Sequence, residues 1–164
     1  MTLSRRISWW ALPALVLWMP GCGSTATTPT DTTTTATATV TAVPSPDTVT
    51  VTAVSGGTYA WTGSFSVTIT NTNTTPLTIK SITADLQQSS GGIVVTPITG
   101  TDEAFRFDVR APGNRIDTNG SMVIPFVFFY SLPNGGREAL VSLSFSAATD
   151  AGASGSVTAT VNFQ

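Results

Sequence analysis

The chain has 164 residues, with seven basic and nine acidic side chains, no histidine, one cysteine and a formal net charge of −2. Such a composition excludes nucleic acid as a partner, because neutralising phosphates requires clustered Lys and Arg. The lack of His also excludes Ser-His-Asp and Cys-His triads and a His/Cys cluster for zinc or copper. We therefore expect a protein that is not an enzyme, has no catalytic residues, binds no metal or cofactor, and relies on an apolar core rather than on disulfides.

Residues 1–21 have the anatomy of an export signal. Arg5 and Arg6 give a positive start, and residues 7–18 (ISWWALPALVLW) form an apolar run of 12 residues. That run is too short to cross a hydrocarbon core of about 30 Å, which takes about 20 helical residues. An uncleaved anchor, an ordinary signal peptide with an incidental cysteine, and a buried helix are the alternatives.

The residues Met19-Pro20-Gly21-Cys22 resemble a bacterial lipobox, whose usual form is Leu, a small residue, Gly or Ala, then Cys. Gly21 and Cys22 match the pattern, whereas Met19 and Pro20 depart from it. The resemblance implies cleavage between Gly21 and Cys22, and acylation of Cys22, so that membrane lipid is a partner. It also implies a bacterial envelope location, and Gly23 in place of the Asp that favours inner-membrane retention points toward the outer membrane.

Residues 22–47 read as a disordered tether that begins at the lipidated cysteine. The stretch 24–47 (STATTPTDTTTTATATVTAVPSPD) is dominated by Thr, Ala and Pro and has no aromatic residue. It cannot bury enough apolar area to offset the entropy lost on ordering. A spacer is the leading interpretation, with a glycosylated stalk or a binding segment as alternatives.

From residue 48 to residue 164 apolar and polar residues alternate, which is typical of strands buried on one face. Gly, Asn and Pro clusters separate these runs at intervals of roughly a dozen residues, and no helical period is present. The pattern predicts an all-β fold, a single immunoglobulin-like β-sandwich of about seven to eight antiparallel strands. The clearest apolar sets are Val49, Val51 and Ala53; Phe65, Val67 and Ile69; Phe105, Phe107 and Val109; Val141, Leu143 and Phe145; and Val157, Ala159, Val161 and Phe163.

Two irregularities fall within the predicted strands. In residues 77–86 the apolar parity changes between Ile79 and Ile82, which predicts a β-bulge near Lys80–Ser81. Pro125 lies inside the predicted strand 122–132 and removes a hydrogen-bond donor, so we expect it at a sheet edge or a bulge.

The segment from Phe65 to Leu86 (FSVTITNTNTTPLTIKSITADL) resembles the LEA14-like (water stress and hypersensitive response) domains, and more loosely other bacterial immunoglobulin-like modules. Asn71, Asn73, Pro76 and Leu77 match the pattern of a strand, an Asn-x-Asn turn and a second strand. Thr72 stands where the family usually has Pro. The resemblance supports the sandwich and implies no catalytic residues.

Acidic residues offer two weaker hypotheses. Residues 102–103 (Asp-Glu), with Asp85 or Asp108 nearby in space, would supply the carboxylate pair of a glycosidase, although adjacent acids are more often a solvated loop. The loops 117–120 and 150–152 contain oxygen ligands suited to calcium. Neither has the spacing of an EF-hand, and turn chemistry accounts for both.

Aromatic residues supply the candidate ligand contacts. Tyr59 and Trp61 lie in the Gly-rich stretch GGTYAWTG, and Tyr130 ends the run Ile124–Tyr130, which is apolar on both parities. Exposed aromatic side chains on a sandwich stack on sugars or anchor protein interfaces. The sequence leaves open whether Phe126–Tyr130 is core or interface.

The leading functional hypothesis is a membrane-anchored lipoprotein whose non-catalytic sandwich serves protein interaction, adhesion or envelope assembly. The alternative is a carbohydrate-binding module on a lipid anchor, using Tyr59, Trp61 or Tyr130. A hydrolase ranks last because the usual catalytic groups are missing.

Overall fold

The computed structural model describes residues 36–88, 94–95, 105–133 and 135–164. The chain divides into two units, Met1–Thr33 and Thr34–Gln164, and the described residues all belong to the second. The predicted signal peptide, Gly21, Cys22 and most of the predicted tether therefore lie outside the described residues. Within the described ranges, no helix has the length and hydropathy needed to span a bilayer.

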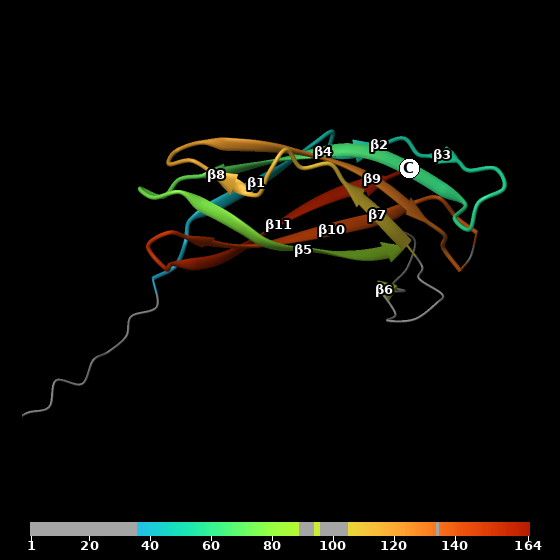
Figure 1. Ribbon diagram of the computed structural model, residues 1–164. Coiled ribbons are helices and arrows are strands. Elements are labelled where there is room, and N and C mark those ends of the chain that lie inside the picture. The colour runs from blue at the N-terminus through green and yellow to red at the C-terminus, as the bar shows by residue number, and fades with distance from the viewer. Residues whose placement is uncertain (1–35, 89–93, 96–104, 134) are drawn as a thin grey trace, which may run out of the picture. The chain divides into compact units, whose positions relative to one another are not determined.

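Two β-sheets pack face to face as an immunoglobulin-like sandwich (Figure 1). One sheet has the order β1-β4-β9-β7, with β3 also paired to β4, and the other has the order β2-β11-β10-β5-β6, with β8 also paired to β5. All pairings are antiparallel except that of β2 with β11, which is parallel. The strands are β1 (Val40–Ser45), β2 (Thr48–Val49), β3 (Thr52–Ala53), β4 (Trp61–Asn71), β5 (Leu77–Gln88), β6 (Val94–Val95), β7 (Phe105–Val109), β8 (Arg115–Ile116), β9 (Ser121–Tyr130), β10 (Ala139–Thr149) and β11 (Ser154–Phe163).

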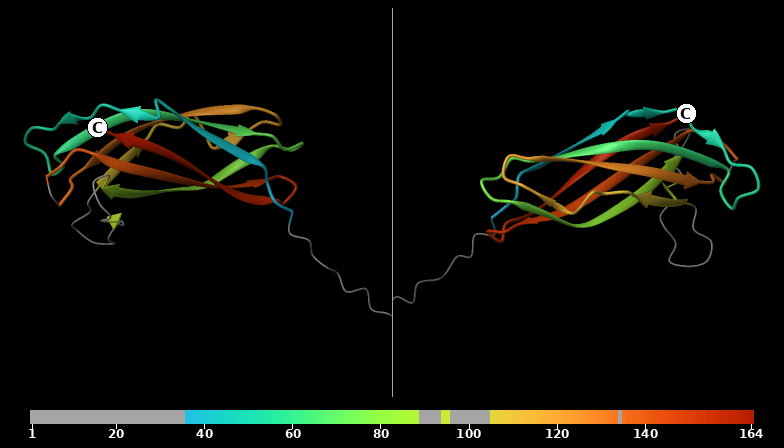
Figure 2. Two further views of the ribbon diagram at one scale, coloured as in Figure 1. Left: turned by 180° about the vertical axis from the view of Figure 1, so that it is seen from behind. Right: turned by 45° about the horizontal axis from the view of Figure 1, so that its top comes forward.

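The predicted all-β sandwich is confirmed. Seven of the strands in the described residues have five residues or more, and the other four are two-residue pairs. The parallel pairing of β2 with β11 corrects the expectation that every strand is antiparallel. It arises because the chain crosses from β1 in one sheet to β2 in the other and continues in the same direction as β11 (Figure 2).

The core lies between the sheets and is rich in aromatic side chains. Phe65 stacks on Phe126 with ring centroids 5.4 Å apart, and Phe128 meets Phe163 edge-on at 5.7 Å. The run Phe126–Tyr130 alternates: Phe126, Phe128 and Tyr130 are at most 1% exposed, whereas Val127 and Phe129 are partly exposed on the outer face of β9. The run therefore belongs to both the core and the surface, according to parity.

Both predicted irregularities are confirmed. Along β10, Ser146 pairs with Ser81 and Ala147 pairs with Ile79, so Lys80 is the extra residue of a bulge in β5. The ladder between β7 and β9 ends at Phe126, and Pro125 is the next residue along β9. Pro125 therefore lies just beyond the end of this ladder, where β9 does not need an N–H donor on the β7 side. The Pro125 carbonyl accepts a hydrogen bond from the N–H of Arg110 at 3.1 Å.

The predicted boundary at residue 48 is wrong, because residues 36–47 belong to the sandwich. Strand β1 pairs along β4, and an isolated bridge joins Thr37 to Ser154. Ala38 is 5% exposed, and Val40 and Ala42 pack against the core. The small Ala and Thr residues suggested disorder, yet Ala38, Val40 and Ala42 alternate with threonines as a half-buried strand requires.

Candidate functional site

Tyr130 is a core residue, so the prediction that it contacts a ligand is wrong. Its ring packs against Phe128 and Phe163, with centroid distances of 6.4 and 5.5 Å, and the residue is 0% exposed. The hydroxyl donates a hydrogen bond to the carbonyl of Arg137. Burial raises the pKa of Tyr130, because ionisation would place a charge inside the sandwich.

Trp61 is directly opposite Tyr130 in the pairing of β4 with β9. It has the parity of the buried residues of β4, is partly buried and packs against the core. Its Nε1 is buried and has no hydrogen-bond partner among the described residues. The indole therefore contributes mainly to packing, and little of it is available to an external ligand.

Tyr59 is the one predicted contact residue that joins an outer-face cluster. Its ring lies against Phe129, with centroids 6.5 Å apart and an angle of 39° between the planes. Arg106 of β7 pairs with Phe129 in the sheet and places its Cζ 4.8 Å from the centre of the Phe129 ring. We call this cluster the Tyr59 patch; with Val54, Gly57 and Thr58 it lines an open hollow of about 230 Å³.

The Tyr59 patch combines apolar and charged groups. The guanidinium of Arg106 over the Phe129 ring is a cation–π contact, worth about 0.5–1 kcal/mol at an exposed site. Asp108 lies 3.5 Å from the Arg106 guanidinium, and both side chains are more than half exposed, so this ion pair adds little to stability. The patch can hold an apolar group against two rings and offer a cation and an anion beside it.

The other acidic candidates are dispersed. Asp85 is exposed on β5 of one sheet and Asp108 is exposed on β7 of the other, while residues 102–103 lie outside the described residues. Both carboxylate oxygens of Asp150 accept hydrogen bonds from Arg115, at 2.9 and 2.6 Å. These bonds lower the pKa of Asp150 and engage the oxygens that a cation would need.

The loop 117–120 is a tight turn. The N–H of Gly120 donates to the carbonyl of Asp117 at 2.9 Å, and Asn119 has a φ of 54°. Turn chemistry thus accounts for these residue types, as expected. The part of the chain that the structure describes contains no group of three or more His, Cys, Asp or Glu placed to hold a metal ion.

The sequence prediction included Phe129 only within the run Ile124–Tyr130, without assigning it to the surface, and it missed Arg106. The signal for Phe129 was present, because alternation through Phe126–Tyr130 places it on the face opposite Phe128. Arg106 likewise alternates with Phe105 and Phe107. The sequence does not reveal the register that places Arg106 beside Phe129. A short hairpin would fix that register, but β7 and β9 are connected by residues 110–120, which include β8.

No family model matches the sequence, and no curated protein matches it either. Among solved structures, similarity is found to a PapD-like (ASH) domain of human CEP192, with a TM-score of 0.43, 13% identity, and coverage of 94% of this chain and 96% of that one. The secreted serine protease VesC of Vibrio cholerae has a TM-score of 0.42 and 11% sequence identity. That match covers 71% of this chain and 21% of the VesC chain. The yeast GGA1 GAE domain has a TM-score of 0.38 and 10% sequence identity, with coverage of 70% of this chain and 87% of that domain. Likenesses at this level carry no information about function.

Proposed function

We propose that this chain is a lipid-anchored protein of the bacterial cell envelope whose sandwich is a non-catalytic module that binds a protein partner. The anchoring half is supported by the sequence, in which Arg5 and Arg6, the apolar run 7–18 and Gly21-Cys22 occur in the order of a lipoprotein signal. Residues 24–35 would act as the tether. Gly23 favours the outer membrane over the inner one.

The binding half rests on the Tyr59 patch. Two aromatic rings and an arginine lie together on the outer face of β7 and β9. The outward residues of the neighbouring β4 are all hydroxyl-bearing: Thr62, Ser64, Ser66, Thr68 and Thr70. Aromatic and Arg side chains are enriched where protein interfaces are strongest, whereas Ser and Thr are not.

The size of the hollow favours a protein over a small ligand. Its volume of about 230 Å³ is below the range of about 300–1,000 Å³ that is typical of small-molecule sites. It suits a single side chain of a partner, placed against the rings of Tyr59 and Phe129. Asp108 and Arg106 at its margin would then bind polar groups of the same partner.

A glycan is the second candidate, supported by the side-by-side placement of Tyr59 with the polar groups of Arg106 and Asp108. Sugars stack on an open ring face, and here Arg106 covers one face of Phe129. Tyr130 is inside the core and Trp61 is packed against it, so Tyr59 alone remains for stacking. We therefore place the protein partner first.

A photo-crosslinking residue at position 58 of the full chain, in living cells, tests the binding half. Thr58 is exposed and lines the hollow, and the exposed Thr160, on the outer face of the other sheet, is the matched control position. We expect a discrete protein adduct from position 58 that is absent from position 160 and lost on Tyr59→Ala. Equal adducts from both positions would refute the patch, and glycan-array binding that Tyr59→Ala abolishes would favour the second candidate instead.

The anchoring half has its own test. Cys22→Ser in the full chain should move the protein from the membrane fraction to the soluble fraction after cell lysis. Ser24→Ala, two residues away, should leave it with the membrane. Retention of the Cys22→Ser protein in the membrane fraction would contradict lipid anchoring without touching the binding half.

A further inference from the structure

One side of β5 is largely unpaired. Strand β10 runs along the whole length of β5 on one side. On the other side, β8 pairs only with Leu77 and Thr78, and β6 pairs only with Leu86 and Gln87. Among the described residues no strand pairs with residues 80–85 on that side, although Ile79 donates its N–H to the carbonyl of Asn114 at 2.8 Å.

The open side presents backbone donors and acceptors. Within a strand, residues whose side chains share a face also direct their N–H and C=O groups to the same side. Ile79 faces inward and directs its N–H to Asn114, away from β10. Ile82 and Ala84 also face inward, so their N–H and C=O groups point to the open side, where an added strand would find them.

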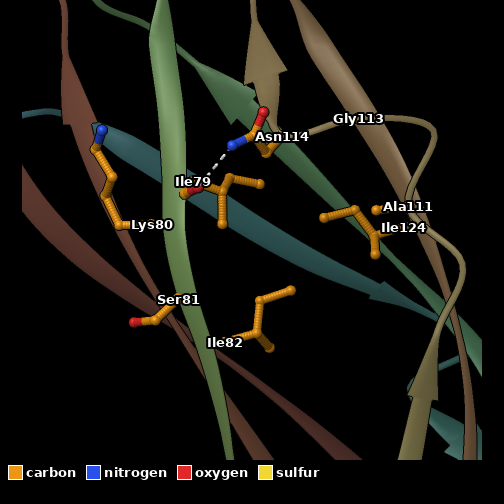
Figure 3. Close-up of a pocket in the computed structure, with 8 residues that line it drawn as sticks. All are labelled: Ile79, Lys80, Ser81, Ile82, Ala111, Gly113, Asn114 and Ile124. Atoms are coloured by element: carbon orange, nitrogen blue, oxygen red, sulfur yellow. Dashed lines mark hydrogen bonds between the residues drawn. The ribbon is translucent and has the colours of Figure 1, made fainter.

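A partly apolar cavity, open to solvent and also lined by Lys80, Ser81 and Asn114, lies beside this edge. It has a volume of about 290 Å³, and Figure 3 shows Ile79 and Ile82 of β5 and Ile124 of β9 converging on it, with Ala111 on its far side. Nearby on β7, Val109 has the parity of the buried Phe105 but is 37% exposed. The margin between the two sheets is therefore partly open next to β5, above the buried Ile79 and Ile124.

The edge carries charge of both signs, with Lys80 at its start and the exposed Asp85 at its end. Lys80, at the bulge, is exposed, and its side chain leaves β5 on the side away from Ile124 (Figure 3). Arg110, just after β7, is also exposed. Neither forms an ion pair within the described ranges, whereas Arg106 and Arg115 are paired with Asp108 and Asp150. An outward-facing acidic residue on an added strand would be a cross-strand neighbour of Lys80.

We propose that β5, from Lys80 to Asp85, accepts an extended segment of a protein partner as an added strand. An apolar residue of the segment occupies the cavity beside Ile82 and Ala111, over the buried Ile124, and an acidic residue lies beside Lys80. Main-chain pairing supplies affinity, and the cavity and the charge supply selectivity. This surface is distinct from the Tyr59 patch and does not depend on it.

The probe is a blocked eight-residue peptide in which valine alternates with threonine and one central threonine is replaced by glutamate. It is titrated into the ¹⁵N-labelled full chain and followed by NMR. We expect shifts of the amide signals of residues 79–86 and 111–114. A peptide methylated on its valine nitrogens should not bind, because it cannot pair with the edge. Shifts confined to other strands, or binding of the methylated peptide with equal affinity, would overturn the proposal.

Charge reversal provides the first control. A matched peptide with lysine in place of the glutamate should bind about fivefold more weakly, and Lys80→Glu should reverse that preference. Arg137→Glu, an exposed reversal outside the edge and the cavity, should leave the preference unchanged. A preference for the acidic peptide that survives in Lys80→Glu would contradict the assignment of the acidic position.

Filling the cavity provides the second control. Ala111 is exposed and lines the cavity, so Ala111→Phe can occupy it without disturbing the core, while Ala111→Ser leaves it open. We expect Ala111→Phe to abolish peptide binding and Ala111→Ser and Tyr59→Ala to retain it. Analytical ultracentrifugation tests the other occupant, a second copy of the chain. If the chain sediments as a dimer, Ala111→Phe sediments as a monomer and no peptide binds, the occupant is a second copy and the proposal is wrong.

Discussion

The side chain of Asn73 holds the backbone of Thr39 as a neighbouring strand would. Its Oδ1 accepts the N–H of Thr39 at 2.9 Å, and its Nδ2 donates to the carbonyl of Thr39 at 2.7 Å. The hydroxyl of Thr72 donates to the same carbonyl at 3.2 Å. The Asn-x-Asn turn therefore forms a junction with the backbone just before β1.

Asn73→Ala should release this junction. Both bonds to Thr39 are lost, and the expected cost is about 1–2 kcal/mol in the free energy of unfolding. Amide hydrogen–deuterium exchange at residues 39–42 should be faster in the variant than in the unmodified chain, whereas exchange in β10 should change much less. Thr74→Ala, at the exposed neighbouring turn position, should leave exchange at residues 39–42 unchanged. Unchanged exchange in Asn73→Ala would show that the junction is held by other contacts.

Gly155 is required where residues 36–38 pass beside the first residues of β11. A Cβ at this position would lie 2.5 Å from the carbonyl oxygen of Ala38, so the backbone must move. Gly155→Ala should cost at least about 1 kcal/mol and raise protease cleavage near residues 36–40. Gly113→Ala meets no atom within 4 Å and is the control. Equal protease resistance of both variants would contradict the close approach.

Asn71 is a buried junction between two loops, residues 72–76 and 117–120. Its Nδ2 donates to the carbonyls of Thr75 and Asp117, both at 3.0 Å, and its Oδ1 accepts the N–H of Asn73 at 2.9 Å. Asn71→Ala leaves these partly buried groups without partners, so we expect about 2–3 kcal/mol of destabilisation in urea denaturation. Asn114→Ala, which loses one bond of 3.5 Å, should cost much less. Similar costs for the two variants would exclude a special role for Asn71.

The ion pair of Arg115 with Asp150 should make stability depend on acid pH. Hydrogen bonds from Arg115 hold the pKa of Asp150 below its ordinary value of 3.8. Its stabilising contribution is therefore present above that ordinary value and is lost as the pH falls through the lowered pKa. In urea denaturation, Asp150→Asn should be less stable than the unmodified chain at pH 7, with the gap closing as the pH falls below 3.8 and narrowing at high salt. A gap that persists at acid pH would point to a cause other than charge.

Tyr130 should make stability depend on alkaline pH. Because burial raises the pKa of Tyr130 above its ordinary value of 10.0, its contribution is complete below that value and is lost as the pH rises above it. Tyr130→Phe should cost about 1 kcal/mol at pH 7, through loss of the bond to the Arg137 carbonyl, and this cost should shrink above about pH 10. Phe128→Leu, which alters a neighbouring buried ring that has no ionisable group, serves as the control, and its cost should not change over this pH range. A constant cost from pH 7 to pH 11 would contradict burial of the hydroxyl.

The sandwich was predictable because period-two alternation is a local property. Alternation predicted the long strands, and the change of parity between Ile79 and Ile82 predicted the bulge at Lys80. Residues 36–47 were missed because low complexity outweighed alternation in a segment built from small side chains. Their strand depends on distant partners, Asn73 for Thr39 and Gly155 for Ala38, which no local pattern contains.

The candidate site was less predictable, because its members come from separate segments. Composition identified Tyr59 and Trp61, at the start of β4, and Tyr130, at the end of β9, as candidate aromatic contacts, but it could not separate surface residues from core residues. Parity along β9 places Tyr130 inside and Phe129 outside once the face of one residue is known. The opening beside β5 depends on where β7 and β8 end, which only the pairing of the sheets determines.

The central claim, that the sandwich is displayed on a lipid anchor, is tested most directly by mass spectrometry of the mature N-terminus, using full chain purified from bacterial membranes. The account predicts an N-terminal peptide that begins at Cys22 and carries the added mass of a diacylglycerol, with an acyl chain on its amine. An N-terminal peptide that begins at Met1, or at another residue with the Cys22 thiol free, would contradict it.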